Sequence, residues 1–117
     1  MIGRQHLKRS MATLSVKPGV EFAEDSLALG RMLSALLLLP YDGELVITAG
    51  SNGLHKVGSK HYTGEALDLR VHNLPDPETV RQLLIAQLGI KFSVLREQPG
   101  TENDHLHLQV RKGGTYP

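Results

Sequence analysis

The sequence predicts an α+β domain in which a small, mostly antiparallel sheet is backed by helices. Two observations indicate helices: apolar residues recur at helical spacing over residues 22–39, and a helix start signal stands at Asp76. A third indicates strands, because apolar and polar side chains alternate over residues 65–71 and 105–110. The expected order of elements is therefore helix, strand, strand, helix, strand, strand.

The two predicted helices are marked by different end signals. The first, over residues 22–39, has Glu24 and Asp25 near its start, where the helix dipole favours acids, and ends at Pro40. The second begins after the N-cap Asp76, with proline at its first position, and ends at Gly89. The side chains expected to be buried are Leu29, Met32, Leu33, Leu36, Leu37, Val80, Leu83, Leu84 and Leu88.

Two further strands are expected beside the alternating pair. Residues 45–49 are largely apolar, as in a buried strand, and a loop rich in Gly, Ser and Asn follows over residues 50–60. Residues 90–95 alternate and are followed by a polar loop over residues 96–103. The residues expected on one side of that strand are Ile90, Phe92 and Val94.

The alternating strands each have an apolar face and a face with polar side chains. In residues 65–71, Leu67, Leu69 and Val71 form the apolar face, and in residues 105–110 it is formed by Leu106, Leu108 and Val110. The opposite faces hold Ala66, Asp68, Arg70, His105, His107 and Gln109. If the apolar faces pack on helices, the polar faces lie together on the open side of the sheet.

Residues 1–19 are expected to form a basic N-terminal arm, because Lys17-Pro18-Gly19 stands as a stop before the first regular element. Residues 20–117 are then a single domain, which is long enough to fold alone around a modest core. Terminal arms are ordered when something holds them. The arm therefore points to a homo-oligomer or to an assembly in which a neighbouring subunit holds it.

Composition argues against several classes of protein. A net charge of +1 and an aromatic content of 4% argue against an electrostatic or base-stacking nucleic-acid binder. There are no cysteines, so any metal must be held by nitrogen and oxygen. The run Leu36-Leu37-Leu38-Leu39 is far shorter than the roughly 20 residues that span a bilayer. No signal-peptide pattern follows the basic start. We therefore expect neither a membrane segment nor an export signal.

Three residues have the chemistry of a metal site. His61 precedes Asp68 by seven residues, and His107 lies in the middle of the last predicted strand. If the two strands are neighbours, Asp68 and His107 reach a common point, and Gly64 allows the turn that brings His61 there. Two imidazoles and a carboxylate suit zinc, and three protein ligands leave the open position typical of catalytic zinc. Iron, cobalt or nickel would also be accepted.

Residues close to these ligands are candidates for catalysis. Zinc lowers the pKa of a bound water towards about 7, and Asp104 would take its proton and later hand one to the leaving amine. His105 shares a strand face with His107 and would stabilise the oxyanion or orient the substrate. Tyr62 and Arg70 are candidates for binding substrate or for supporting the ligands.

Each of these residues also has an ordinary structural explanation. A histidine is more often a surface or satisfied core residue than a ligand, and we expect this of His6, His55 and His72. Aspartate is depleted in strands, and Asp68 could be there to pair with Lys60 or Arg70. The combination of residue types and spacings nevertheless favours zinc.

The pattern Ser59-x-His61-x-x-Gly64-x-Ala66-x-Asp68, followed by Asp104-x-x-His107, resembles the zinc D-Ala-D-Ala carboxypeptidase family. Its superfamily includes D,D-dipeptidases, phage L-alanyl-D-glutamate endolysins and the signalling domain of hedgehog proteins, and the similarity spans about residues 44–111. The resemblance implies a hedgehog/DD-peptidase-like fold and, as substrate, the peptide stem of bacterial peptidoglycan. The implied roles are zinc ligands for His61, Asp68 and His107, catalytic base for Asp104 and transition-state stabilisation for His105. Separately from the resemblance, we expect Ser59, Tyr62 and Arg70 to bind substrate.

One departure from the family concerns substrate binding. Family enzymes usually carry an arginine soon after the strand that corresponds to residues 45–49, where this chain has Ser51-Asn52-Gly53. The role is vacant or is taken by His55, Lys56 or Arg70. Hedgehog domains also keep the zinc site in a protein whose task is binding.

We therefore expect a zinc metallopeptidase that cuts peptide-stem bonds of peptidoglycan, as a D,D-carboxypeptidase or an endolysin encoded by a phage or a bacterium. Without an export signal, it would stay in the cytoplasm until lysis or be carried in a phage particle. The alternative is a non-catalytic structural or interaction protein on the same zinc fold, such as a virion head, neck or tail component. An arm over the cleft or on another subunit favours the alternative, and an open cleft with Asp104 near the open metal position favours catalysis.

Overall fold

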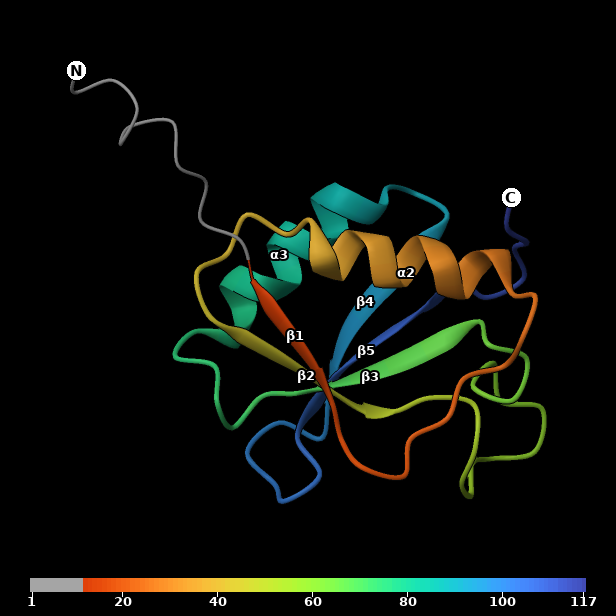
Figure 1. The fold of residues 1–117 in the computed structure, drawn as a ribbon, viewed down its shortest axis with the longest axis horizontal. Helices are drawn as coiled ribbons and strands as arrows, with labels where there is room; N and C mark the ends of the chain where they lie inside the picture. Colours follow the sequence, from red (N-terminus) through yellow and green to blue (C-terminus); the bar gives the residue numbers. More distant parts are fainter. Residues whose placement is uncertain (1–11) are drawn as a thin grey trace.

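The computed structural model describes residues 12–117, whose strands form one five-stranded sheet in the order β1-β2-β3-β5-β4 (Figure 1). The strands are Thr13–Val16 (β1), Glu44–Ala49 (β2), Ala66–Arg70 (β3), Phe92–Glu97 (β4) and His105–Val110 (β5). β1 pairs with β2 in parallel, and the other neighbouring pairs are antiparallel. The predicted α+β class with a mostly antiparallel sheet is therefore confirmed.

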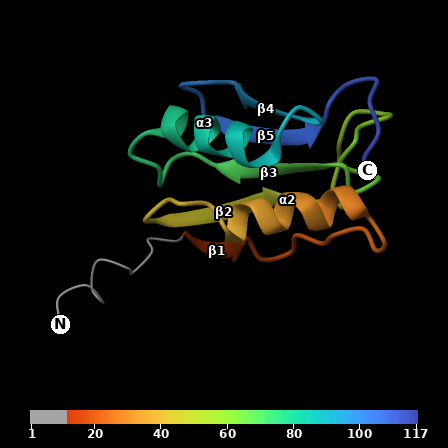
Figure 2. The same ribbon diagram turned by 90° about the horizontal axis from the view of Figure 1, so that it is seen from above.

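Helices α2 (Leu27–Leu37) and α3 (Pro77–Leu88) lie on one side of the sheet, as Figures 1 and 2 show. The predicted ends of α3 are confirmed, since Asp76 is its N-cap and Gly89 its C-cap. Helix α2 begins later than predicted, because Ser26 is the N-cap and its Oγ accepts a hydrogen bond from the Leu29 amide. Asp25 has a φ of 60°, a left-handed conformation that keeps the chain before Ser26 out of the helix. Neither helix in residues 12–117 is long and apolar enough to cross a membrane.

The core lies between these helices and the sheet. The fully buried residues include Met32, Leu36, Leu67, Leu69, Val80, Leu84, Leu106, Leu108 and Val110. Three residues expected to be buried in the helices are not: Leu33 and Leu83 are partly buried, and Leu37, at the end of α2, is exposed. Ile90 was predicted to share a strand face with Phe92 and Val94, but it lies outside the strand and is 86% exposed, because β4 starts only at Phe92.

The strand β1 was not predicted, since its residues were assigned to the arm 1–19. It is the edge strand of the sheet and pairs with β2 in the register Leu14↔Leu45. Four residues followed by Lys17-Pro18-Gly19 give too short a pattern to indicate a strand, and parallel pairing with a distant segment leaves no local signal. The domain therefore includes β1, and the rest of the predicted arm, residues 1–11, lies outside the described residues.

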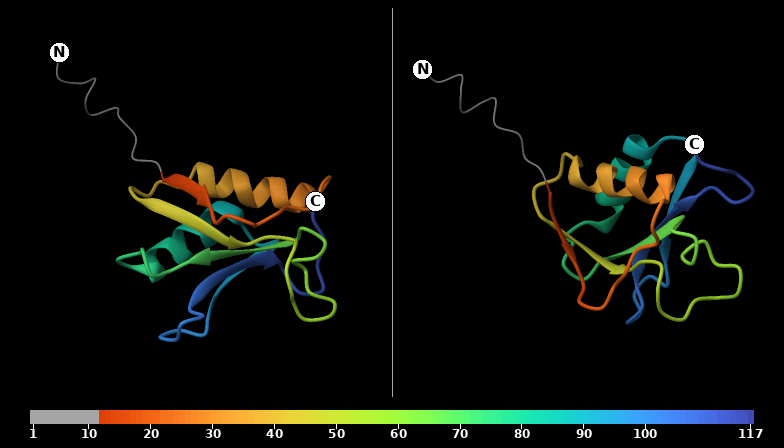
Figure 3. Two further views of the ribbon diagram at one scale, coloured as in Figure 1. Left: turned by 60° about the horizontal axis from the view of Figure 1, so that its bottom comes forward. Right: turned by 45° about the vertical axis from the view of Figure 1, so that its right-hand side comes forward.

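The pairing of the strands sets the positions of the polar residues. Asp68 is directly opposite His107, and Arg70 is opposite His105, which is itself opposite Glu97 of β4. Because side chains alternate between the two faces of a sheet, these residues project away from the leucines that pack on the helices. Figure 3 shows the connection between β2 and β3 and the turn between β4 and β5 on the side of the sheet away from the helices.

Candidate metal centre

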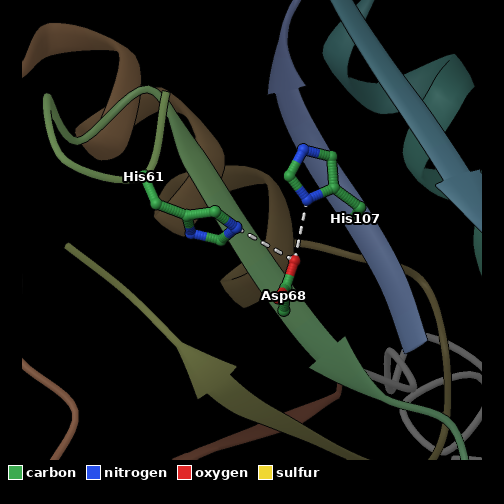
Figure 4. A group of neighbouring side chains, drawn as sticks. All are labelled: His61, Asp68 and His107. Atoms are coloured by element: carbon green, nitrogen blue, oxygen red, sulfur yellow. Dashed lines mark hydrogen bonds and ion pairs between the residues drawn. The ribbon is translucent and has the colours of Figure 1, made fainter. Parts of the chain in front are cut away.

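The side chains of His61, Asp68 and His107 converge on one point (Figure 4). The Oδ1 atom of Asp68, on β3, lies 2.8 Å from Nδ1 of His107, on β5, and 3.3 Å from Nε2 of His61. The three candidate ligand atoms all lie within 4.8 Å of one another. Both histidines are buried and Asp68 is half-buried. The predicted trio is thus brought together, and it could hold a metal ion.

The turn that carries His61 is anchored to helix α2. Gly64 has a φ of 77°, which glycine adopts without strain, and its carbonyl accepts a hydrogen bond of 2.9 Å from Ser26 Oγ. A Cβ atom at Gly64 would lie 2.9 Å from that of Ser26, which is closer than such atoms pack. Because Ser26 also caps α2, the helix and the turn share one anchor.

The ring of His61 is supported by His55, which stacks on it with ring centroids 4.2 Å apart and planes 6° apart. The Tyr62 hydroxyl accepts a hydrogen bond from the His55 amide and donates one to the His55 carbonyl, at 2.7 and 2.9 Å. Tyr62, predicted as a substrate or supporting residue, therefore holds the loop that presents His55. The supporting role of His55 was not predicted, because it depends on the path of the loop.

The outer nitrogen of each histidine in the trio is bonded to a carbonyl oxygen. His61 Nδ1 lies 2.9 Å from the Gly50 carbonyl, and His107 Nε2 lies 2.7 Å from Oε1 of Gln109. These oxygens only accept hydrogen bonds, so in the neutral rings the outer nitrogens carry the protons and the inner lone pairs face Asp68. Metal-binding histidines are oriented in this way. Two such nitrogens and a carboxylate fit a divalent cation, and zinc accepts all three ligands.

The charge state of the trio also fits a cation. Burial raises the pKa of Asp68, but its hydrogen bonds with His107 and His61 lower it by more, so that the pKa lies well below its ordinary value. Burial lowers the pKa of His107, and its hydrogen bonds with Asp68 and Gln109 raise it by more. An ionised carboxylate at this point therefore attracts either a proton on His107 or a metal ion.

A second pair of side chains lies beside the trio. His105 Nε2 is 3.0 Å from Oε1 of Glu97 and 3.8 Å from Oδ1 of Asp68, and the same Glu97 oxygen is 3.9 Å from Nδ1 of His107. His105 Nδ1 is bonded to the Asn103 carbonyl. Glu97, His105 and His107 form a further group that could hold a metal ion. Glu97 was not predicted, because only the pairing of β4 with β5 brings it to His105.

Asp104, the predicted general base, is engaged in a different set of contacts. Its two oxygens accept hydrogen bonds from Nε and Nη2 of Arg96, at 3.0 and 2.7 Å, and the Gly100 amide donates a third bond of 2.9 Å. The contact with Arg96 holds the pKa of Asp104 at about 2. Side chains alternate along β4, so Arg96 lies on the face of the buried residues Phe92 and Val94. Glu97 lies on the opposite face, where it is paired with His105. Asp104 also lines the cleft, and the carboxylate of Glu97 lies 3.9 Å from Nδ1 of His107.

Asp104→Asn is expected to lower stability at neutral pH and to have less effect as the pH falls. The folded-state pKa of about 2 lies below the unfolded value of about 3.9, so the contribution of the carboxylate is present above about pH 4 and is lost as the pH falls towards 2. Thermal unfolding of both proteins between about pH 2 and pH 7 measures the difference. A difference that stays constant below pH 4 would contradict this role of the ion pair.

The other predicted residues lie in the same open cleft as the trio. Ser59 and Arg70 line the cleft, and Ser59 Oγ accepts a hydrogen bond of 3.1 Å from the His61 amide. In residues 12–117, neither Lys60 nor Arg70 pairs with Asp68, whose partners are histidines. His72 also lines the cleft, and His6 lies outside the described residues.

No family model, curated protein or solved structure matches the chain. The fold and the site by themselves define its class: an α+β protein with a candidate centre of two histidines and an aspartate in an open cleft.

Proposed function

We propose that the protein is a zinc-dependent metallopeptidase that hydrolyses peptide-stem bonds of bacterial peptidoglycan, on the fold of the D-Ala-D-Ala carboxypeptidase and hedgehog family. The observation that carries the proposal is the convergence of His61, Asp68 and His107 in an open cleft. Three protein ligands leave a coordination position for water or substrate, which is the arrangement of catalytic zinc sites. The residue pattern that resembles the family supplies the same three ligands.

The residues around the trio suit peptide hydrolysis. Bound zinc would supply a Lewis acid that polarises the peptide carbonyl and lowers the pKa of the attacking water. Glu97 would accept a proton from that water and return one to the leaving amine, a role that is supported by its 44% exposed side chain and its contact with His105. His105, whose ring nitrogens contact Asn103 and Glu97, would stabilise the oxyanion. Asp104 stabilises the turn between β4 and β5 through Arg96 and Gly100.

Release of peptides and amino acids from purified peptidoglycan, with and without added zinc, tests this function. We expect zinc-dependent release by the wild type, and mass spectrometry of the fragments identifies the bond. Glu97→Gln should lower the rate by about 10²–10⁴-fold, the usual effect of losing a general base, while zinc content is unchanged. Asp104→Asn, the matched carboxylate-to-amide variant, should lower it much less.

The outcomes of this experiment separate the alternatives. A loss of activity in Asp104→Asn with none in Glu97→Gln would return the role of base to Asp104. The absence of release by the zinc-loaded wild type would refute the peptidase.

One observation favours a second candidate, a non-catalytic binding or structural protein such as a virion component. Family enzymes carry a substrate-binding arginine in the segment that corresponds to residues 51–53. In this chain the side chains of that segment make structural hydrogen bonds instead. Ser51 Oγ accepts a hydrogen bond of 2.7 Å from the Ala23 amide, and Asn52 Oδ1 accepts one of 2.8 Å from the Glu21 amide. A wild-type protein that binds zinc but releases no peptide from peptidoglycan would support this second candidate.

A further inference from the structure

The cleft gathers cationic side chains that have no acidic partner among residues 12–117. Five lysine and arginine residues line it: Lys17, Lys56, Lys60, Arg70 and Lys112. Within residues 12–117, the arginine and lysine ion pairs are those of Arg81 and Arg96, and neither of these residues lines the cleft. Four acids also line the cleft, and three of them have partners: Asp68 and Glu97 contact histidines, and Asp104 pairs with Arg96. An anionic ligand would meet an excess of positive charge here.

Arg70 differs from the lysines because the sheet fixes its position. It lies on β3 two residues after Asp68, on the same face, and opposite His105. Arg70, His105 and Glu97 thus form a row across three strands, next to the row of Asp68 and His107. Arg70 is half-buried, and its guanidinium has no hydrogen-bond partner among residues 12–117. A guanidinium in this situation is suited to bind a carboxylate through two parallel hydrogen bonds.

The spacing along β3 determines which carboxylate can reach Arg70. Two strand residues span about 6–7 Å, and an extended peptide spans about 3.3–3.6 Å per residue. A peptide whose scissile carbonyl lies at the trio therefore brings a carboxylate one or two residues further along to the level of Arg70. We infer that Arg70 binds the C-terminal carboxylate of the ligand, so that the cleft selects peptides with a free C-terminus next to the bond at the metal centre. This inference rests on the proposed function, because it takes the trio as the position of the bond.

Equilibrium binding of two peptides to the zinc-loaded protein tests the inference without requiring turnover. The probes are L-Lys-D-Ala-D-Ala with a free C-terminus and the same peptide with a C-terminal amide, whose integrity is checked by mass spectrometry. The wild type should bind the acid about 10- to 100-fold more tightly, the usual effect of hydrogen bonds to a charged group. Arg70→Ala should remove most of this preference, and Arg70→Lys should retain part of it.

Lys112→Ala is the matched control, because it removes the same charge from an exposed position that also lines the cleft. It should leave the preference for the acid unchanged. Equal binding of acid and amide by the wild type would overturn the inference, and so would an equal loss of preference in Lys112→Ala and Arg70→Ala. An amidated peptide with an internal glutamate that binds as tightly as the free acid would also overturn it, since the anion would then be a side chain.

The two proposals fail in distinguishable ways. A zinc-loaded protein that prefers the free acid but releases nothing from peptidoglycan would refute the hydrolysis and leave the role of Arg70 standing. Release of peptides by a protein that binds acid and amide equally would refute the role of Arg70 and leave the hydrolysis standing. Zinc content is measured first in every variant, and Arg70→Ala should keep it, because Arg70 contributes no ligand.

Discussion

Asp68→Ala is expected to abolish metal binding while leaving the fold in place. Oδ1 of Asp68 is the atom on which both ring nitrogens of the trio converge, at 2.8 and 3.3 Å. Its removal takes away one of three ligands and the trio's only negative charge, and leaves two imidazoles that bind a divalent ion far less well. The loss of affinity should exceed the about 10- to 100-fold that follows from removing a residue that only orients a ligand.

Metal content of the purified proteins and calorimetric titration with zinc measure this effect. The wild type should bind one ion per chain and Asp68→Ala none, with unchanged circular dichroism. Gln109→Ala is the control, because Gln109 Oε1 contacts the outer nitrogen of His107 and supplies no ligand. It should weaken binding by about 10- to 100-fold and keep the stoichiometry. Undiminished binding by Asp68→Ala would exclude the trio as the site, and the same titrations with iron, cobalt and nickel establish which metal is preferred.

The elements that could be predicted from the sequence are those with local signals. Helix α3 is marked by Asp76 at one end and Gly89 at the other, and β3 and β5 are marked by alternation. Strand β1 has no such signal, because it is four residues long and pairs with residues about thirty positions further along the chain. The start of α2 was placed too early, because Ser26 caps it rather than the acids before it.

Some residues of the candidate site could be predicted from local sequence signals, and others could not. The polar faces of β3 and β5 can be predicted from the alternation in the sequence. Predicting the trio then requires only that the two strands are neighbours, as they are in the structure. Glu97 and Asp104 depend instead on the register of β4 against β5, which places Glu97 opposite His105. A shift of one residue would exchange the faces of Arg96 and Glu97. The sequence does not reveal that register, because the irregular turn between the two strands sets it.

Leu108→Ala is expected to lower the free energy of unfolding by about 2–5 kcal/mol, the range for truncating a buried leucine. Leu108 is fully buried in the core and lies on β5 between His107 and Gln109. Its neighbours on the adjacent strands are Leu67 and Val94, so truncation opens a cavity bordered by three strands. The expected loss is a large fraction of the about 5–15 kcal/mol that stabilises a typical domain.

Urea unfolding of the metal-free proteins, followed by circular dichroism, measures the loss. Ile90→Ala is the matched control, because Ile90 is also aliphatic but is 86% exposed. Its effect should stay within about 0.5 kcal/mol, as is usual for surface substitutions. An equally small effect of Leu108→Ala would contradict its place in the core.

Zinc is expected to restore much of the stability that Leu108→Ala loses. An ion that binds the folded chain alone adds its binding free energy to folding, about 4 kcal/mol when free zinc is about 1,000 times the dissociation constant. Leu108 faces the helices, whereas His107 faces the cleft, so the substitution leaves the ligand atoms in place. The restoration should vanish when Asp68→Ala is added, because the trio then lacks one of its three ligands. A restoration that persists in the double variant would show that zinc stabilises the fold through residues other than the trio.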